Sequence, residues 1–509
     1  MPTPRDVHEI TLDDYDLPTL CRLARSDTPL ALGADVAAAI GRCADFVGAA
    51  AYSDDMIYGV NTGFGALCEV RIQPEDIGNL QVKHVLSHAC GVGDPLPVPL
   101  ARLVMLIKLL TFRSGHTGIG LATVQRLLDF WNHGLTPAIP IRGTVGASGD
   151  LAPLSHMALP LLGLGSFLVE GTKVPAREVL DRHGWAPLNL GPKEGLALTN
   201  GVQFINAIAA DCTVRLAALA RVADVAAALS VQAFSCSQSF YQDIYHRTSR
   251  HPERRQVAAN LRLLLEGSNH HQRAGANRSK QDPYSFRCVP QVHGAARQLL
   301  RFAEGVITNE VNGVSDNPLF FPESGEIHFG GNLHGQSTAF CLDLMAMAAT
   351  ELSSISERRT YQLLSGTRGL PPFLVSAYGA NSGLMIVQYT AAALVNENKV
   401  LSTPASVDTI MTCHLQEDSV SMGGTSAIKL LQVVENLETV LAIELLAAAQ
   451  ASELGSDIAP SAATAALLAE IRGAVPFLDE DRILSEDILR VAALVRRRAE
   501  AWRDDHGLA

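Results

Sequence analysis

Long apolar stretches alternate along the chain with short loops rich in proline and glycine. In five stretches the apolar residues recur at helical spacing or continue almost without interruption, as expected of long helices in a large core. They cover approximately residues 98–132, 202–234, 338–364, 383–401 and 425–453. Strand signals are few and short, near residues 166–174 and 319–329. The pattern therefore predicts a mainly α protein.

The stretch 202–234 is apolar on nearly all sides of its predicted helix. A helix of this kind is either buried in a large core or spans a membrane. Four charged residues interrupt it: Asp211, Arg215, Arg221 and Asp224. Because charged side chains are costly inside a bilayer, burial in a helical bundle is the favoured interpretation.

Composition changes near residue 202, from loop-rich sequence to sequence dominated by long helices. We therefore expect an N-terminal domain over residues 1–202. The region 203–509 is expected to form a bundle of long helices with a C-terminal helical segment. Within it, the polar segment 267–283 is predicted to be a loop.

The 509-residue chain has a formal net charge of −12, which disfavours nucleic acid or an anionic membrane as a partner. Its nine cysteines include no C-x-x-C pair, so neither a disulfide framework nor a zinc module is indicated. A reducing cytoplasm is the simplest location. The sequence has no H-E-x-x-H, G-x-S-x-G or P-loop motif, so zinc peptidase, α/β-hydrolase and nucleotide-binding functions lack their signatures.

The segment 143–165, GTVGASGDLAPLSHMALPLLGLG, places the small residues Ala147, Ser148 and Gly149 where the chain must turn. Small residues let two backbones approach closely, and glycine adopts positive φ easily. Packing alone is one explanation of this turn. The other is chemical, because a backbone held so tightly could react with itself.

Several polar residues lie in loops or turns. Tyr58 opens the loop YGVNTGFG, where it is either packed or held as an acid or base. His88 precedes a glycine turn in SHACGVGDP, either as a structural hydrogen-bonding residue or as a catalyst. Glu417 lies in LQEDSVSMGG ahead of a predicted helix, where the helix dipole alone favours acidic residues. Asn317 lies in SDNP, a turn by composition.

Tyr284 and Arg287 are three positions apart in QDPYSFRC, residues 281–288. If this segment is helical, the phenol and the guanidinium lie on one face. Arginine is well suited to bidentate recognition of a carboxylate, and a surface ion pair is the simpler alternative.

Together these segments, from about residue 55 to about 455, resemble the aromatic amino acid ammonia-lyases and aminomutases. GTVGASGDLAPLSHM is highly specific to that family, and GNLHGQ, NENKVLSTPASVD and QEDSVSMG resemble its histidine ammonia-lyase branch. The resemblance implies a mainly α fold of the ammonia-lyase/fumarase type, with a loop-rich N-terminal domain and a core bundle of long helices. It also implies a homotetramer whose active sites draw residues from three subunits.

In that family the Ala-Ser-Gly triplet cyclises without another enzyme. The resemblance implies that the backbone nitrogen of Gly149 attacks the carbonyl of Ala147, and that Ser148 supplies the exocyclic carbon of a methylidene-imidazolone ring. The methylene of this ring is an electrophile that captures the amine of a small amino acid substrate. No metal or nucleotide is implied.

The resemblance also assigns roles around the reacting atoms. Tyr58 matches the base that takes the β-proton, and Asn200 in LALTNG matches a residue that tunes the prosthetic ring. Glu417 matches the acid near the substrate side chain and amine. His88 matches the position that reads the substrate ring, where phenylalanine and tyrosine lyases usually have Phe-Leu or His-Leu in place of Ser87-His88.

Arg287 matches the clamp on the substrate carboxylate, assisted by Tyr284 and Asn317, and Gln281 matches a residue lining the site. Two positions depart from the family. Leu333 stands in GGNLHG where the family has Phe, so one wall of the pocket should be wider or softer. The chain reads CHLQED where histidine enzymes typically read Ser-Ala-Asn-Gln-Glu-Asp, a change that could re-aim the acidic side chain.

The first hypothesis is an ammonia-lyase that converts L-histidine to urocanate and ammonia. The second keeps the aromatic amino acid chemistry, as a 2,3-aminomutase on histidine or another aromatic amino acid, or as a tyrosine or phenylalanine ammonia-lyase. The third is a non-catalytic helical scaffold, which the intact triplet, Tyr58 and Arg287 oppose.

Overall fold

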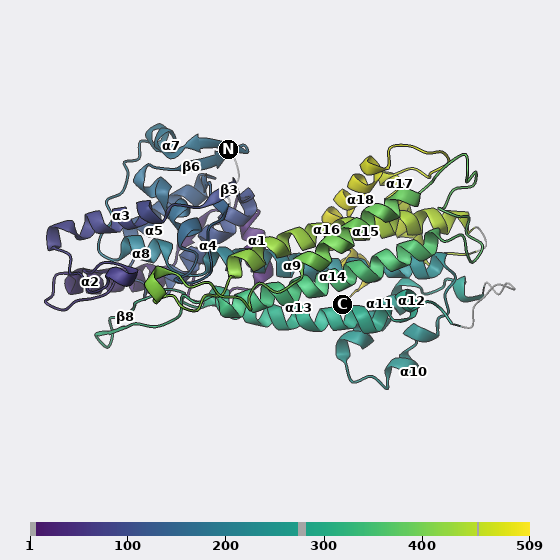
Figure 1. Ribbon diagram of the computed structural model, residues 1–509, viewed down its shortest axis with the longest axis horizontal. Helices are drawn as coiled ribbons and strands as arrows, with labels where there is room; N and C mark the ends of the chain where they lie inside the picture. The colour runs from purple at the N-terminus through teal and green to yellow at the C-terminus, as the bar shows by residue number, and fades with distance from the viewer. Residues whose placement is uncertain (1–6, 273–280, 456–457, 509) are drawn as a thin grey trace. The chain divides into compact units, whose positions relative to one another are not determined.

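Helices form most of the structure, a computed structural model that describes residues 7–272, 281–455 and 458–508 (Figure 1). The mainly α fold predicted from the sequence is confirmed. The chain forms two compact units from interleaved segments. Unit one contains residues 7–214, Glu304–Asp343 and Pro404–Ile428, and unit two contains Arg215–Ala303, Leu344–Thr403 and residues 429–508. The predicted division at residue 202 stays a prediction.

Short helices joined by loops dominate unit one. Those lying wholly within it are α1 (Leu17–Ala24), α2 (Ala34–Ala51), α3 (Ile77–His88), α4 (Val98–Arg113), α5 (Leu121–Asn132), α6 (Leu151–Ala158), α7 (Ala176–His183) and α8 (Glu194–Thr199). Helix α1 shows how such a short element begins: the Asp16 carboxylate accepts a hydrogen bond from the Thr19 N–H at 2.6 Å.

The strands of unit one form small, separate sheets. They are the parallel pair β1 (His8–Ile10) and β2 (Leu30–Leu32), the antiparallel pair β3 (Val92–Pro95) and β5 (Pro140–Arg142), the antiparallel sheet β4 (Thr136–Pro137), β6 (Ser166–Val169) and β7 (Thr172–Pro175), and the antiparallel pair β8 (Leu319–Phe321) and β9 (Glu326–His328). The two strand signals in the sequence correspond to the hairpins β6–β7 and β8–β9.

The stretch 98–132 was predicted as one helix and forms two, α4 and α5, so this prediction is wrong. Gly115 and Gly118 lie between them with φ of +68° and +74°, a conformation outside the right-handed helix. A Cβ atom at Gly115 would lie 2.8 Å from the carbonyl oxygen of Ala39, so the chain also passes close to α2 at this point. Apolar residues continue on both sides of the turn that Gly115 and Gly118 form, so the sequence pattern did not show where α4 ends and α5 begins.

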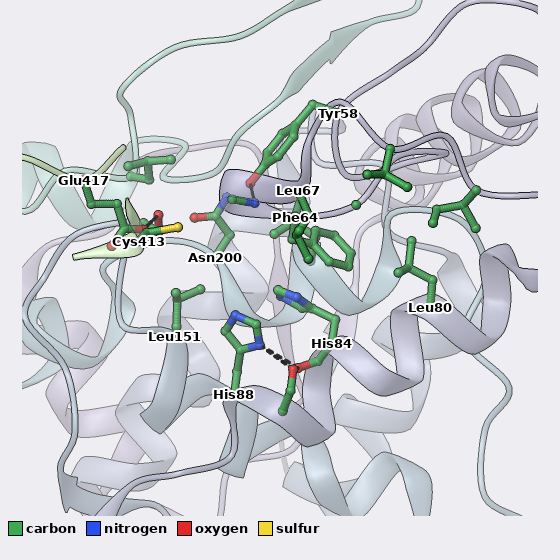
Figure 2. A pocket seen from close by; sticks show the side chains of 18 residues that line it. Tyr58, Phe64, Leu67, Leu80, His84, His88, Leu151, Asn200, Cys413 and Glu417 are labelled. Atoms are coloured by element: carbon green, nitrogen blue, oxygen red, sulfur yellow. Dashed lines mark hydrogen bonds between the residues drawn. The ribbon is translucent and has the colours of Figure 1, made fainter. Parts of the chain in front are cut away.

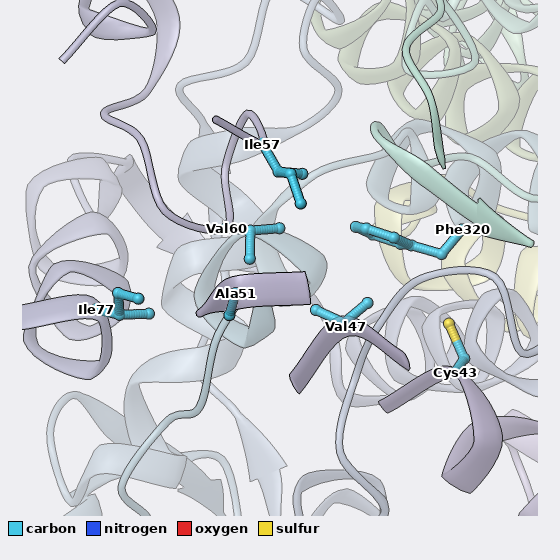
Figure 3. Packing of buried hydrophobic residues seen from close by; sticks show 7 residues of the cluster. All are labelled: Cys43, Val47, Ala51, Ile57, Val60, Ile77 and Phe320. Atoms are coloured by element: carbon cyan, nitrogen blue, oxygen red, sulfur yellow. The ribbon is translucent and has the colours of Figure 1, made fainter. Parts of the chain in front are cut away.

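A cluster of buried side chains anchors the loop that carries Tyr58 (Figure 3). Cys43, Val47 and Ala51 contribute to it from successive turns of α2, because residues four apart share one face of a helix. Ile57 and Val60 pack into the same cluster and flank Tyr58 in sequence. The backbone on both sides of Tyr58 is therefore fixed by apolar burial.

Long helices dominate unit two, and four of them begin or end in unit one. The long helices are α9 (Gln203–Ala233), α13 (Val289–Asn312), α14 (Gln336–Leu364), α15 (Met385–Leu401) and α16 (Gly423–Leu454). The shorter ones are α10 (Asp243–His246), α11 (Pro252–Leu264), α12 (Tyr284–Arg287), α17 (Ala462–Ala474), α18 (Leu484–Arg498) and α19 (Ala501–His506). Four of the five long-helix predictions are confirmed to within two residues. Part of the loop predicted over 267–283 lies outside the described residues.

Buried polar pairs join the long helices within unit two. Asp224 on α9 contacts the Nδ1 atom of His293 on α13 at 2.7 Å, and both side chains are fully buried. Arg359 on α14 pairs with Glu444 on α16 at 2.5 Å, again without exposure. Asp224, one of the charges that argued against a membrane-spanning 202–234, is therefore paired inside a helical bundle.

One described helix, α14, is long and apolar enough to cross a membrane by length and composition alone. Of its apolar window, 67% is buried within the structure. Packing against other helices therefore accounts for its apolar character.

Candidate functional site

A cavity of about 510 Å³ in unit one brings together segments that are far apart in the sequence (Figure 2). This volume is typical of a site for a small molecule. Six residues predicted for the site line it: Tyr58, His88, Ser148, Asn200, Leu333 and Glu417. Much of the remaining wall is apolar, including Phe64, Leu80 and Leu196.

The Ala-Ser-Gly triplet forms a tight turn at the cavity. Ser148 has a φ of +51° and Gly149 a φ of +82°, both in the left-handed region. Gly149 pairs with Gly201 as an isolated parallel bridge. A Cβ atom at Gly149 would lie 2.1 Å from the carbonyl oxygen of Gly201, so no side chain fits there. Ala147 is buried beside them, 5% exposed.

Asp150 fixes the end of this turn. Its backbone N–H donates to the Gly201 carbonyl at 2.7 Å. Its carboxylate accepts from the Thr144 hydroxyl at 2.8 Å and from the Ile205 N–H at 3.0 Å. Burial raises the pKa of Asp150 to about 6, against the lowering effect of these hydrogen bonds.

Glu417 lies directly against the triplet. The Ser148 hydroxyl donates a hydrogen bond to its Oε1 atom. The Thr412 hydroxyl donates to its Oε2 atom at 2.6 Å, and the Thr412 N–H donates to the Glu417 carbonyl at 3.1 Å. Both carboxylate oxygens are therefore held, and the carboxylate has a fixed orientation toward Ser148.

Asn200 follows α8 and connects the triplet to the SDNP turn. Its Nδ2 atom donates to the Asn317 carbonyl at 2.9 Å, and its Oδ1 atom accepts from the Gly201 N–H at 3.0 Å. The Asn317 side chain accepts from the Gly330 N–H at 2.8 Å. Asn317 thus supports Asn200 through its backbone, while its own side chain binds the neighbouring loop.

Tyr58 and Gly65 are the two ends of the loop YGVNTGFG. The Gly65 N–H donates a hydrogen bond to the phenolic oxygen of Tyr58 at 3.2 Å. Burial raises the pKa of Tyr58 above its usual value, and the Gly65 N–H offsets only part of this effect. Tyr58 in the free chain therefore carries its proton at neutral pH.

Two histidine rings form part of the cavity wall, and their tautomers follow from their partners. His88 Nδ1 lies 2.8 Å from the carbonyl oxygen of His84, which can only accept, so Nδ1 carries the hydrogen and Nε2 is an acceptor. The His84 ring lies between those of Phe64 and His88, with both centroid separations at 4.0 Å. Burial lowers the pKa of both histidines, that of His84 to about 2. Both rings are therefore neutral at neutral pH.

The CHLQED segment forms an unusual turn. Cys413, His414 and Leu415 have φ of +50°, +54° and +70°, three consecutive side-chain-bearing residues in the left-handed region. Cys413 lines the cavity, whereas His414 and Leu415 are exposed. Of the three residues that differ in this segment, Cys413 is the one that lines the cavity. Leu333 also lines the cavity.

Three predicted site residues lie in unit two. Tyr284 and Arg287 lie on the short helix α12, as their spacing suggested, with the Arg287 guanidinium 4.4 Å from the centre of the Tyr284 ring. Tyr284 is 70% exposed, and Gln281 is exposed as well. The Nε atom of Arg287 is buried and has no hydrogen-bond partner among the described residues.

Sequence reasoning missed four polar residues that support the cavity from behind or from the side. Lys108 donates to the Asn200 carbonyl at 2.5 Å, and Lys193 pairs with Asp316 at 2.8 Å, with both side chains of that pair fully buried. The fourth is Thr412. The apolar run ARLVMLIKLLTF contains a single lysine, Lys108. Because a lysine is rarely buried unless it has a partner, this position indicated a specific polar contact. Nothing local marked Thr412.

The sequence profile of the family described as aromatic amino acid lyase matches residues 15–473. The chain belongs to this family. It is 49% identical over 449 residues to a histidine ammonia-lyase of Anaeromyxobacter sp. (strain K), with 86% of this chain and 88% of the relative covered. The predicted resemblance to the aromatic amino acid lyases is therefore confirmed.

Solved structures of relatives share the fold along the whole chain. The histidine ammonia-lyase from Trypanosoma cruzi matches with a TM-score of 0.90 and 38% identity, covering 98% of this chain and 96% of that one. The tyrosine aminomutase from Streptomyces globisporus matches with a TM-score of 0.92 and 34% identity, covering 98% and 99%. The protein is thus an enzyme of the aromatic amino acid lyase family in both sequence and fold.

Proposed function

We propose that this aromatic amino acid lyase eliminates ammonia from L-histidine to give urocanate. The observation that carries the proposal is the compressed Ala147–Ser148–Gly149 turn, which faces Glu417 and shares one cavity with Tyr58. The 49% identity to a relative named histidine ammonia-lyase favours histidine among the aromatic substrates.

The triplet residues fit a methylidene-imidazolone ring. Closing the ring joins the Gly149 nitrogen to the Ala147 carbonyl carbon, and the left-handed φ of both Ser148 and Gly149 folds this segment back on itself. The space that a Cβ would need at Gly149 is filled by Gly201, so the Gly201 backbone packs directly against the turn. Once formed, the ring supplies an electrophilic carbon toward the substrate amine, which turns a poor leaving group into a better one.

The chain's own residues provide proton transfer. Tyr58 takes the β-proton of the substrate, and the Gly65 N–H stabilises the phenolate that this requires. Because burial raises the pKa of Tyr58, this base works better as the pH rises. Glu417, held by Thr412, keeps a carboxylate beside the position where the substrate amine reacts.

His88 recognises the imidazole side chain. Its neutral ring presents Nε2 as a hydrogen-bond acceptor, because Nδ1 is engaged with the His84 carbonyl. An imidazole N–H of the substrate is a matching donor, whereas a phenyl ring offers none. Arg287 binds the substrate carboxylate, with Tyr284 beside it, while Gln281 and Asn317 line the completed site.

We further propose that the active enzyme is a cytoplasmic homotetramer with shared active sites. The exposure of Tyr284 supports this, because a residue expected at the site is left open in the single chain. On α15, Ile386, Tyr389 and Val400 share one face and are 57%, 59% and 67% exposed. Large apolar side chains exposed on one side of a helix are typical of an interface. An active monomer of 54.3 kDa in sedimentation would contradict the assembly.

A 2,3-aminomutase is the second candidate, favoured by the structural match to the tyrosine aminomutase. The two reactions share the elimination step and differ in whether ammonia returns to the β-carbon. Higher identity to histidine ammonia-lyases places the lyase first.

Incubation with L-histidine, L-tyrosine and L-phenylalanine in parallel tests the proposal. We expect the conjugated acrylate to appear by absorbance, fastest with L-histidine, and no β-amino acid by mass spectrometry. A faster reaction of tyrosine or phenylalanine would make that amino acid the preferred substrate. Accumulation of a β-amino acid would make the enzyme an aminomutase. Neither result would change the family.

The intact mass of the protein tests the prosthetic group independently of activity. Wild type should weigh two water molecules less than the encoded chain, and Ser148→Ala should not, because it has no side-chain hydroxyl to lose. Ser155→Ala is the matched control, since Ser155 is a fully buried serine on α6 whose hydroxyl has no partner. It should lose both waters as wild type does.

A further inference from the structure

Lys108 is a buried amine that the proposed chemistry does not use. It lies on α4 with 0% exposure, between Ile107 and Leu109, which are also buried. Burial lowers the pKa of Lys108 to about 7, and the nearby Asp316 carboxylate opposes this effect. An apolar side chain of similar length would avoid the cost of burying an amine. Its presence calls for an explanation in its contacts.

Both polar atoms within hydrogen-bond distance of the Lys108 amine are acceptors. Nζ donates to the Asn200 carbonyl at 2.5 Å and lies 3.5 Å from Oε1 of Gln203. The Asn200 carbonyl belongs to the peptide bond between Asn200 and Gly201. Lys108 therefore holds the backbone of this turn, whereas Asn317 holds the Asn200 side chain.

The Asn200–Gly201 turn that Lys108 holds packs directly against the triplet. The oxygen and nitrogen atoms of Gly201 would lie 2.1 and 2.3 Å from a Cβ atom at Gly149. Gly201 itself has a φ of +103°, and a Cβ there would lie 2.1 Å from the carbonyl oxygen of Ser315. Gly201 is thus enclosed on both sides, and its backbone transmits the position of the Asn200 peptide to Gly149.

We propose that Lys108 is a positioning residue for cyclisation of the triplet, holding the Asn200–Gly201 peptide so that Gly201 keeps Gly149 compressed against Ala147. This inference rests on the proposed prosthetic group. In the cyclisation a bond forms between the Gly149 nitrogen and the Ala147 carbonyl carbon. The Ala147 carbonyl oxygen leaves as water with the amide hydrogens of Gly149 and Ser148, as a C=N double bond forms between the Ala147 carbon and the Ser148 nitrogen. The Ser148 hydroxyl leaves as the second water with the Cα hydrogen. Lys108 touches none of these atoms and acts through the Asn200–Gly201 backbone.

Substitution of Lys108 with a neutral side chain tests the inference by intact mass. Lys108→Met keeps the length of the side chain and removes the donor. Lys108→Gln is measured in parallel, because its polar end is better tolerated if the first variant folds poorly, and its amide N–H is one bond too short to reach the Asn200 carbonyl. Each is expressed at low temperature, and the fraction eluting with wild type is analysed. We expect the dehydrated fraction of both to fall at least tenfold below wild type, with kcat falling in proportion.

Arg102→Met is the matched control. Arg102 is a second buried basic residue on α4 that donates to backbone carbonyls, those of Ala24 and Ser26, away from the triplet. It should lower the thermal midpoint about as much as Lys108→Met and still be fully dehydrated. Equal loss of thermal stability with full dehydration in Arg102→Met alone would separate positioning of the triplet from a general loss of stability.

The outcomes distinguish this inference from the function it rests on. Wild type at its encoded mass would overturn the prosthetic group itself. Dehydrated wild type together with a folded, fully dehydrated Lys108→Met or Lys108→Gln would overturn the role of Lys108 alone. Loss of dehydration in Arg102→Met to the same extent would also overturn it, because any destabilisation of α4 would then suffice.

Discussion

The Ser148 hydroxyl donates a hydrogen bond to Oε1 of Glu417, a residue 269 positions further along the chain. Thr412 holds the other oxygen of the same carboxylate at 2.6 Å. The acid is therefore positioned from two sides, by the residue proposed to become the electrophile and by a threonine five positions before it. This arrangement makes the contribution of Thr412 measurable.

Thr412→Val should reduce kcat about tenfold to a hundredfold, because hydrogen bonds to charged groups contribute about 1.5–3 kcal/mol and the side chain is otherwise nearly isosteric. Thr412→Ser keeps the hydroxyl and should recover most of the activity. The measurement is kcat at saturating L-histidine on protein whose intact mass shows complete dehydration. Equal activity of the valine and serine variants would mean that Glu417 keeps its orientation without this bond.

Tyr58→Phe should lower kcat by about 10²–10⁴, the range typical of losing a general base. The ring and its packing are retained, so the thermal midpoint should change little. Tyr52→Phe is the control, because Tyr52 is 63% exposed and lies just after α2. Near-wild-type turnover of a dehydrated Tyr58→Phe enzyme would leave Tyr58 as a packed loop residue.

The pH profile of the wild type provides a second check on Tyr58. Burial raises the pKa of this phenol above 10, so the reactive phenolate fraction grows as the pH rises through the neutral and mildly alkaline range. We expect kcat/KM for L-histidine to be still rising at about pH 9. A plateau already reached near neutral pH would point to a different base.

The sequence predicted those parts of the molecule that local patterns determine. Apolar periodicity located α9, α14, α15 and α16, and the small residues at 147–149 marked the turn at the cavity. It missed α13, although Val289, Leu300 and Ile307 recur there on one buried face, because polar residues fill the rest of that helix. An amphipathic helix carries a weaker signal than a wholly apolar one.

The site itself depends on contacts between distant segments, which a local pattern does not encode. Lys108 lies 92 positions from the carbonyl it holds, and the apolar run around it indicates a buried lysine without indicating its partner. The unusual CHL sequence was predicted as one departure, yet Cys413 lines the cavity while His414 is exposed. That distinction depends on the left-handed turn at residues 413–415, a backbone conformation that these residue types rarely adopt and do not predict.

His88→Leu should lower kcat/KM for L-histidine about tenfold to a hundredfold while leaving that for L-phenylalanine unchanged or higher. The reason is that a buried imidazole without its hydrogen-bond partner costs about 1–3 kcal/mol, and a phenyl ring has no such bond to lose. His133→Leu, an exposed histidine next to the end of α5, is the control. Equal losses for both substrates would show that His88 supports the cavity wall and does not read the ring.

The last prediction concerns acid stability and His84. Burial lowers its folded-state pKa to about 2, and repulsion from Lys193 and from His88 in its protonated form acts in the same direction. Its Nε2 lies 2.8 Å from the Thr199 hydroxyl, whereas Nδ1, the atom that a proton would join, is buried without a partner. The folded-state pKa is below the unfolded value of 6.5, so the stabilisation is present above pH 6.5 and is lost as the pH falls toward about 2.

His84→Gln removes this titration and keeps an amide that can bond to Thr199. Urea unfolding midpoints of wild type and variant, at one protein concentration and at several pH values from neutral to about pH 4, isolate the contribution of His84. The unfolding free energy of wild type minus that of the variant should be constant above pH 6.5. Below pH 6.5 this difference should decrease by about 1.4 kcal/mol per pH unit, because wild type loses stability that the variant does not lose. Histidines present in both proteins cancel in this difference. A difference that stays flat down to about pH 4 would mean that His84 takes up its proton in the folded state as readily as in the unfolded one, so that its ring is not sealed between Phe64 and His88.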